Sequence, residues 1–296
     1  MKILNFGSLN IDHVYRVPYI VRPGETLSSS DLKYYAGGKG ANQSVAIAKA
    51  GGNVYHAGKI GADGAWLQDE LKKSGVNSDY IQTGDCPTGH AIIQVTDAGE
   101  NSIVLFGGGN HLITDSEINE TLAGFEAGDY LVLQNEINSV DRIIDAAHTK
   151  GMHIFLNPAP FAENVKKWPL EKLRCLIVNE TEAMGLLGKE LPLDEVVDGL
   201  CSRYPSLEIV MTAGGDGAYY GLGSERHFVP SRKVNAVDTT AAGDTFFGYY
   251  LTSLIGGLSA VDSMKRAAYA ASITVSRPGA MDSIPLASEI PSIEKL

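Results

Sequence analysis

Short apolar segments typical of strands alternate with amphipathic segments typical of helices over most of the 296 residues. The strand-like segments are residues 3–6, 130–133, 153–156, 175–178 and 208–211. The helical segments are residues 43–50, 63–74, 139–150 and 193–204, and a glycine follows each of the first three. Because glycine commonly ends helices, these boundaries are consistent with one another. The alternation predicts a three-layer α/β/α fold, with helices on both faces of a mostly parallel sheet.

Two regions interrupt this alternation. Residues 11–35 contain strand-like pieces, prolines and a serine-rich turn, and residues 89–106 have the pattern of a hairpin around a polar turn. Both regions leave the α/β part where strands end, which is where open sheets bind ligands. We expect them to form one small antiparallel sheet that serves as a lid, within a single domain of residues 1–296.

Composition restricts the partners of the chain. The net charge is −11 and no block of lysine or arginine stands out, so we expect no nucleic acid partner. The three cysteines form no Cys-x-x-Cys pair, which argues against a disulfide framework or a zinc site. No apolar run approaches the ~18 residues of a membrane span, and the N-terminus lacks a signal-peptide pattern. We therefore expect a cytoplasmic protein with no membrane partner.

A turn of small residues precedes an apolar helical run near the C-terminus. Ala241, Ala242 and Gly243 leave the backbone uncovered, and Asp244 follows them. Free N–H groups and the helix dipole favour an anion at such a position. A carboxylate beside a phosphate site suggests a base that deprotonates a hydroxyl during phosphoryl transfer. Taken alone, the same pattern is more often a simple helix cap.

Two segments in the first 50 residues suggest a binding site for a polyhydroxyl ligand. Residues 37–42 place Lys39 and Asn42 on a glycine-rich turn before a helix. Lys39 is followed by glycine and not by serine or threonine, so the segment is not a P-loop. Asn10 and Asp12 follow the first strand and point to the same side of an extended chain. Ordinary turns and caps are the structural alternatives for both segments.

Two further segments lie at strand ends. Asn179 and Glu182 match an asparagine capping box, and the same pair also suits a hydrated magnesium ion and phosphate oxygens. Thr212, Gly214 and Gly217 end a strand in a glycine-rich turn, which permits close approach by a nucleotide.

These segments, in this order, resemble the ribokinase-like (PfkB) family of carbohydrate kinases over essentially the whole chain. The two signatures are residues 37–42 and residues 238–245, with the Asn179-x-x-Glu182 pattern between them. Within the family, the resemblance is strongest to members that phosphorylate D-ribose at its 5-hydroxyl with ATP. A kinase for another pentose, a hexose or a nucleoside, and a catalytically silent sugar-binding regulator on the same fold, are the alternatives.

The resemblance also implies a role for individual residues. Asp244 would be the catalytic base, and the backbone of Ala241, Ala242 and Gly243 would form an anion hole. The sugar would be held by Asn10, Asp12, Gly38, Lys39, Asn42, Glu136 and Asp244. The nucleotide would lie against Asn179, Thr212, Gly214, Gly217, Gly243 and Ala268, with Glu182 near Mg²⁺. A potassium-type activating cation would be held by Asp238, Thr240, Thr274, Arg277, Gly279 and Ser283. Family members commonly dimerise through their lids, so a homodimer is also implied.

Overall fold

The computed structural model describes residues 1–296 and contains two sheets and eight α-helices. The strands are β1 (Ile3–Phe6), β2 (Asn10–Arg16), β3 (Asp31–Gly37), β4 (Val54–Ile60), β5 (Asn77–Thr83), β6 (Gly89–Val95), β7 (Asn101–Phe106), β8 (Tyr130–Gln134), β9 (His153–Asn157), β10 (Cys175–Asn179), β11 (Glu208–Ala213), β12 (Gly217–Leu222) and β13 (Glu225–Pro230). The α-helices are α1 (Lys39–Lys49), α2 (Ala65–Lys73), α3 (Asp115–Ala123), α4 (Val140–Thr149), α5 (Glu180–Leu187), α6 (Leu193–Arg203), α7 (Ala242–Ile255) and α8 (Ala260–Thr274). None of these helices is long and apolar enough to cross a membrane.

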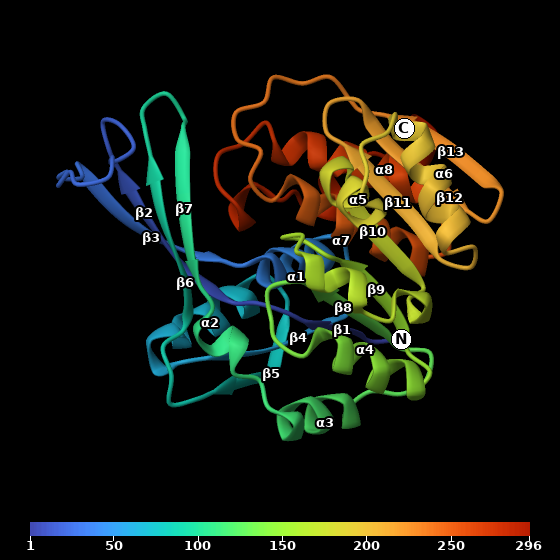
Figure 1. The fold of residues 1–296 in the computed structure, drawn as a ribbon, viewed down its shortest axis with the longest axis horizontal. Helices are drawn as coiled ribbons and strands as arrows, with labels where there is room; N and C mark the ends of the chain where they lie inside the picture. Colours follow the sequence, from blue (N-terminus) through green and yellow to red (C-terminus); the bar gives the residue numbers. More distant parts are fainter.

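The larger sheet has nine strands in the order β13-β12-β11-β10-β9-β8-β1-β4-β5 (Figure 1). All neighbouring pairs from β11 to β5 are parallel, and the β12–β13 hairpin adds two antiparallel strands at one edge. The mostly parallel sheet predicted from the strand–helix alternation is therefore confirmed. The chain proceeds from β1 to β4 and β5 on one side and later continues from β8 on the other side of β1. The strand order thus reverses between β1 and β8, which is where α/β sheets form ligand crevices.

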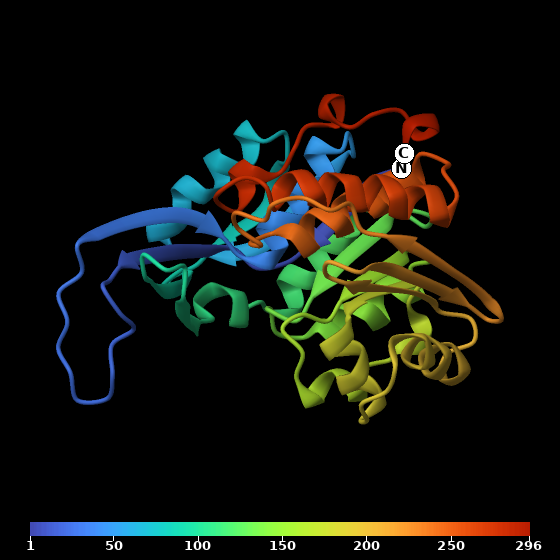
Figure 2. The ribbon, with the colours of Figure 1, turned by 90° about the horizontal axis from the view of Figure 1, so that it is seen from above.

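Helices cover both faces of this sheet (Figure 2). Successive strand residues point to opposite faces, so Ile3 belongs to one buried cluster and Leu4 to the other. The first cluster contains the buried faces of α1, α2, α7 and α8, and the second contains those of α3, α4, α5 and α6. The first cluster holds α1 and α7 against the same face of the sheet, and this places the segments that begin these helices side by side.

The smaller sheet has the order β3-β2-β6-β7 and projects from the body of the molecule (Figure 1). The β2–β3 and β6–β7 pairs are antiparallel, whereas the central β2–β6 pair is parallel, with Asn10 opposite Gly89. The middle pair is parallel because β2 and β6 both run outward from the main sheet. Segments 11–35 and 89–106 thus share one sheet, and the loop between β2 and β3 reaches far from the body (Figure 2).

Several elements begin or end differently from the sequence expectation. Helix α1 starts at Lys39 and not at residue 43, because its first turn is made of the Gly-rich motif itself. The sequence reasoning also missed strands β4 and β5 and the β12–β13 hairpin. Strand β5 is an edge strand with a polar sequence, and β12 contains glycine at both its start and its interior, so neither has a clear apolar pattern.

Candidate active site

Polar side chains gather at the carboxyl ends of neighbouring strands in the main sheet. Ser8 lies just after β1, Glu136 lies just after β8, and Asn157 is the last residue of β9. The Glu136 carboxylate accepts hydrogen bonds from the Ser8 hydroxyl and from the backbone N–H of Lys39, the latter at 2.9 Å. The carboxylate that follows β8 is therefore bonded both to the segment after β1 and to the start of α1.

Asp244 is buried in the first turn of α7, with only 6% of its surface exposed. Its carboxylate does not cap its own helix. Asn42 Nδ2 donates to Asp244 Oδ2 at 3.1 Å, and Gln43 Nε2 donates to Asp244 Oδ1 at 2.9 Å. The side chain is therefore turned toward α1, so the simple-cap interpretation of this residue is wrong.

The start of α7 offers free backbone N–H groups. Ala241 precedes the helix in the left-handed conformation, with φ 59°, and no side chain caps the helix. The first N–H groups of a helix lack partners within it. The Ala242 N–H donates to the carbonyl oxygen of Thr239 at 3.3 Å, whereas the Gly243 N–H has no such partner and is available to a ligand. A Cβ atom added at Gly243 would meet no atom within 4 Å, so the backbone there is open. This arrangement could bind an anion next to the Asp244 carboxylate.

Lys39 supplies a cation to this cluster of carboxylates. The negative charge of Asp244 raises the pKa of the Lys39 ammonium, burial opposes this effect, and Glu136 and Glu182 raise the pKa further. The negative charges of these carboxylates therefore favour the charged form of the lysine.

Glycines allow the start of α1 to approach β1 closely. Gly38 has φ 97°, a conformation that residues with a side chain rarely adopt. A Cβ atom at Gly40 would overlap the backbone of Gly7 and Ser8, so the helix begins directly against the chain that leaves β1. These contacts explain why the motif needs glycine, and they bring Lys39 and Asn42 to the strand ends.

Asn10 and Asp12 lie on the same face of β2, as predicted from their spacing. The Asn10 Oδ1 atom accepts a hydrogen bond from Asn110 Nδ2 at 2.8 Å. Burial raises the pKa of Asp12 to about 7, and the negative charge of Glu136 adds to this shift. The Asp12 carboxylate occupies the space that a side chain at position 37 would fill, so Gly37 is needed beside it.

Asn179 and Glu182 form the capping box of α5. Asn179 Oδ1 accepts from Glu182 N at 2.8 Å, and Glu182 Oε2 accepts from Asn179 N at 3.0 Å. Burial raises the pKa of Glu182, whereas the Asn179 N–H and the charge of Lys39 oppose this rise. The structural interpretation of this motif is therefore confirmed, and Glu182 also belongs to the charge cluster around Lys39.

A cavity of about 540 Å³ opens beside the start of α7. Five of the residues predicted to bind the nucleotide line this cavity: Thr212, Gly214, Gly217, Gly243 and Ala268. Asn179 is not among its lining residues. The volume lies within the range of small-molecule sites, about 300–1,000 Å³. Residues missed by the sequence reasoning also line it: Gly215, Ser231, Arg232, Lys233, Val234, Ala236, Thr239, Phe246, Ala271, Ser272 and Val275. A pattern of small and apolar residues along α8 and at its C-cap was the available signal for the last three.

The proposed cation residues lie in two loops that contact each other. Asp238 Oδ1 accepts from Thr240 N at 2.9 Å, and Asp238 Oδ2 accepts from Gly279 N at 3.0 Å. Burial raises the pKa of Asp238, but the hydrogen bonds from Thr240 and Gly279 outweigh it and lower the pKa overall. Thr274 contacts the hydroxyl of Thr245 on α7 at 3.0 Å. These contacts join both loops to the start of α7.

Two other residues of the predicted cation set have side chains engaged elsewhere. The Arg277 guanidinium donates to Glu289 Oε2 at 2.6 Å, and Ser283 Oγ donates to the carbonyl oxygen of Ala280 at 2.7 Å. In Arg277, the main-chain carbonyl oxygen is therefore the atom suited to a cation. No three histidine, cysteine, aspartate or glutamate side chains lie close enough together to hold a metal ion.

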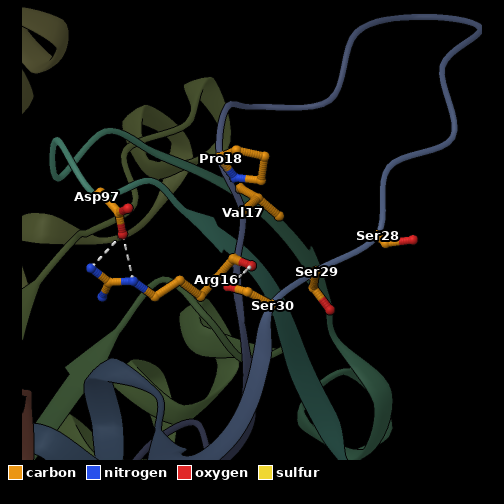
Figure 3. A pocket seen from close by; sticks show the side chains of 7 residues that line it. All are labelled: Arg16, Val17, Pro18, Ser28, Ser29, Ser30 and Asp97. Atoms are coloured by element: carbon orange, nitrogen blue, oxygen red, sulfur yellow. Dashed lines mark hydrogen bonds and ion pairs between the residues drawn. The ribbon is translucent and has the colours of Figure 1, made fainter.

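A second hollow, of about 350 Å³, lies at the outer end of the small sheet (Figure 3). It is lined by Arg16, Val17, Pro18, Ser28, Ser29, Ser30 and Asp97. Arg16 pairs with Asp97 in this hollow at 2.7 Å, and both side chains are largely exposed. None of the predicted site residues lines it, so it is separate from the candidate active site.

Known proteins match this chain over nearly its whole length. A family model described as "pfkB family carbohydrate kinase" matches residues 1–287. The ribokinase of Haemophilus influenzae is 35% identical over 291 residues, which cover 96% of this chain and 95% of that protein. The crystal structure of ribokinase from Cryptococcus neoformans var. grubii in complex with ADP is similar with a TM-score of 0.86 and 34% identity, covering 99% and 98% of the two chains. The ribokinase of Arabidopsis thaliana complexed with ribose and ATP has a TM-score of 0.85 and 27% identity, covering 99% and 97%.

Proposed function

The chain belongs to the pfkB family of carbohydrate kinases, and we propose that it transfers the γ-phosphoryl group of ATP to the 5-hydroxyl of D-ribose. The preference for ribose is supported by the similarity to ribokinases over nearly the full length of both chains. It is also supported by the presence of ribose and ATP in the similar Arabidopsis thaliana structure.

The observation that carries this proposal is the position of the Asp244 carboxylate. It lies in the first turn of α7, between the uncapped helix start and the amides of α1. In this role Asp244 accepts the proton of the sugar hydroxyl while that oxygen attacks the γ-phosphorus atom, and the bond to the β-phosphate oxygen breaks. The backbone of Ala241, Ala242 and Gly243 stabilises the charge on the transferring phosphoryl group.

The sugar is proposed to lie between β2 and the start of α1. Hydrogen-bond acceptors and amide groups in fixed directions come from Asn10, Asp12, Asn42 and Glu136. The site is closed at the start of α1 by Gly38 and Lys39. Asn42 Oδ1 is buried and has no hydrogen-bond partner within the protein, so a sugar hydroxyl would satisfy it.

The nucleotide is proposed to occupy the 540 Å³ cavity next to Asp244. Thr212, Gly214 and Gly217 border it on the sheet side, and Ala268 borders it on α8. Asn179 takes part indirectly, by orienting Glu182 through the capping box. The phosphates then point toward the start of α7, whose backbone is open at Gly243.

ATP-dependent transfer requires Mg²⁺, and the residues present fit it. Glu182 is a buried carboxylate beside Lys39 and Asp244, and Mg²⁺ is usually held by one or two carboxylates, water and substrate phosphates. When bound, the ion would neutralise charge on the phosphate oxygens. Glu182 is the residue proposed to hold it, and Asn179 keeps the Glu182 side chain in place.

A monovalent cation, most suitably K⁺, is proposed between the loops that meet at Asp238. The oxygens available there are the Asp238 carboxylate and the main-chain and hydroxyl oxygens of Thr240, Thr274, Arg277, Gly279 and Ser283. Hard oxygen ligands of this kind suit such cations. The cation would fix the loops that support the start of α7.

Residues 1–296 are proposed to act as one kinase domain, with the small sheet as a lid over the sugar. Strand β7 exposes the apolar side chains of Ile103, Val104, Leu105 and Phe106. Exposed apolar surfaces of this kind commonly mark interaction sites, so we propose a homodimer formed through the lid. The three cysteines are free, which suits the reducing cytoplasm as the site of action.

A coupled assay of ATP consumption over pentoses, hexoses and nucleosides tests the proposal. We expect the highest kcat/KM with D-ribose and a product phosphorylated at O5, identified by NMR. A clear preference for a hexose or a nucleoside would overturn the ribose assignment while leaving the kinase activity. Sugar binding without ATP consumption would instead support the catalytically silent regulator.

A further inference from the structure

Polar side chains beneath Asp244 form a continuous hydrogen-bonded network. Gln43 is fully buried, and its Nε2 atom donates to Asp244 Oδ1 at 2.9 Å and to Asn157 Oδ1 at 3.1 Å. We propose that Gln43 is a positioning residue that fixes the orientation of the Asp244 carboxylate, and that Gln134 and Asn5 fix Gln43 in turn. This inference rests on the proposed role of Asp244 as the base.

The hydrogen bonds of this network are compatible with only one arrangement of donors and acceptors. A carboxylate can only accept, so Gln43 must direct its NH₂ group toward Asp244 and its oxygen away from it. Gln134 Nε2 donates to this oxygen at 2.7 Å and to Asn5 Oδ1 at 3.0 Å. Asn5 Nδ2 then donates to the carbonyl oxygen of Gly40 at 2.7 Å, in the first turn of α1.

The alternation of side chains along the strands brings these amides together. Asn5, Gln134 and Asn157 lie on the neighbouring strands β1, β8 and β9, and Gln134 pairs in register with Asn157. Val132 and Phe155, two residues before Gln134 and Asn157, belong to the buried cluster that contains α1 and α7. The three amides therefore face α1 and α7, between the apolar core and the active site.

Gln43 and Asn42 hold Asp244 from two directions. Neighbouring residues on a helix point about 100° apart, so Asn42 reaches Oδ2 and Gln43 reaches Oδ1. Asn42 has an oxygen free for the sugar, whereas both polar atoms of Gln43 are used inside the protein. Gln43 therefore lacks a contact to offer the substrate, and its effect reaches the reaction only through Asp244.

Gln43→Met tests this inference, because methionine has a similar length and cannot donate a hydrogen bond. Misplacing a reacting group slightly can cost about a hundredfold in rate, so we expect kcat to fall by about ten- to a hundredfold. The sugar KM should change less than about threefold, because Gln43 does not contact the substrate.

Tyr250→Phe is the matched control. Tyr250 lies on α7 and donates a buried hydrogen bond to Glu208, away from the active site. We expect this variant to lower the melting temperature and to keep the wild-type kcat and sugar KM. If Gln43→Met does not fold, Gln134→Met removes the donor that orients Gln43, and the same loss of kcat with unchanged KM is expected.

Folded Gln43→Met or Gln134→Met enzyme with wild-type kcat would overturn the inference. A loss of activity that appears only as a raised sugar KM would also overturn it, because it would indicate a binding role. Asp244→Asn separates the two proposals. If Asp244→Asn is inactive and Gln43→Met is normal, only the positioning role fails, whereas an active Asp244→Asn enzyme would refute both proposals.

Discussion

Asp12 is a candidate site residue whose chemistry is strongly altered by its surroundings. Burial and the charge of Glu136 raise its pKa to about 7, so in the free protein the carboxyl group is protonated below that pH. A sugar hydroxyl that donates to Asp12 favours the ionised form, as hydrogen bonds to a carboxylate do. Binding of the sugar should therefore be coupled to release of a proton from Asp12.

The affinity for ribose should fall as the pH drops below about 7, by up to tenfold for each pH unit, because one proton must be displaced. Isothermal titration calorimetry between pH 5 and 8 measures this dependence. In Asp12→Asn, the affinity should be lower at pH 8 and nearly independent of pH. A wild-type affinity that stays constant across this range would rule out the coupling.

The sequence allowed Asp244, Lys39 and Asn42 to be predicted because each belongs to a compact motif with a recognisable spacing. Gln43 and Asn157 were not predicted as site residues, although Gln43 directly follows the segment 37–42 and Asn157 directly follows the predicted strand 153–156. Their importance depends on the contact between α1, α7 and β9, which joins residues far apart in the sequence. A polar residue on the buried side of a helix or at a strand end is the signal that was available.

At the scale of elements, the loops around Asp238 connect the end of α8 to the start of α7. Asp238 receives N–H groups from both Thr240 and Gly279, and Thr274 contacts Thr245. A cation bound there would tighten the turn that supplies the anion hole. The long alternation of strands and helices predicted the main sheet well, whereas edge elements such as β5 and β13 lack that signal because solvent covers one side of them.

Replacing K⁺ with Na⁺ should therefore lower kcat. If the loops lose the equivalent of one hydrogen bond, about 1–1.5 kcal/mol, the rate should fall by about tenfold. Steady-state assays at constant ionic strength measure this effect, and Asp238→Ala should abolish the difference between the two cations. Equal rates in both salts for the wild-type enzyme would refute the proposed cation site.

At the scale of the whole molecule, the small sheet leaves apolar side chains in water. Val104 and Phe106 on β7 are 65% and 49% exposed, and they lie on the same face because they are two residues apart. If this sheet forms the dimer contact, multi-angle light scattering should give the mass of two chains. The Val104→Lys/Phe106→Lys double variant should shift the protein toward the monomer.

Phe228→Lys provides the control for this experiment, because Phe228 is 48% exposed on β13, in the other sheet. This variant should keep the dimer mass. A wild-type protein with the mass of one chain at micromolar concentration would exclude the proposed dimer. A dimer that survives the double variant would exclude this face as its interface.

The central claim is that Asp244 removes the proton from the sugar hydroxyl, and Asp244→Asn tests it most directly. The variant keeps the shape of the side chain and loses the basic oxygen. We predict that kcat with D-ribose falls by about 10²–10⁴-fold, as for removal of a general base, while the ribose Kd changes by less than about threefold. Both values are measured on protein whose thermal unfolding matches the wild type. Near-normal turnover in the folded variant would contradict the account.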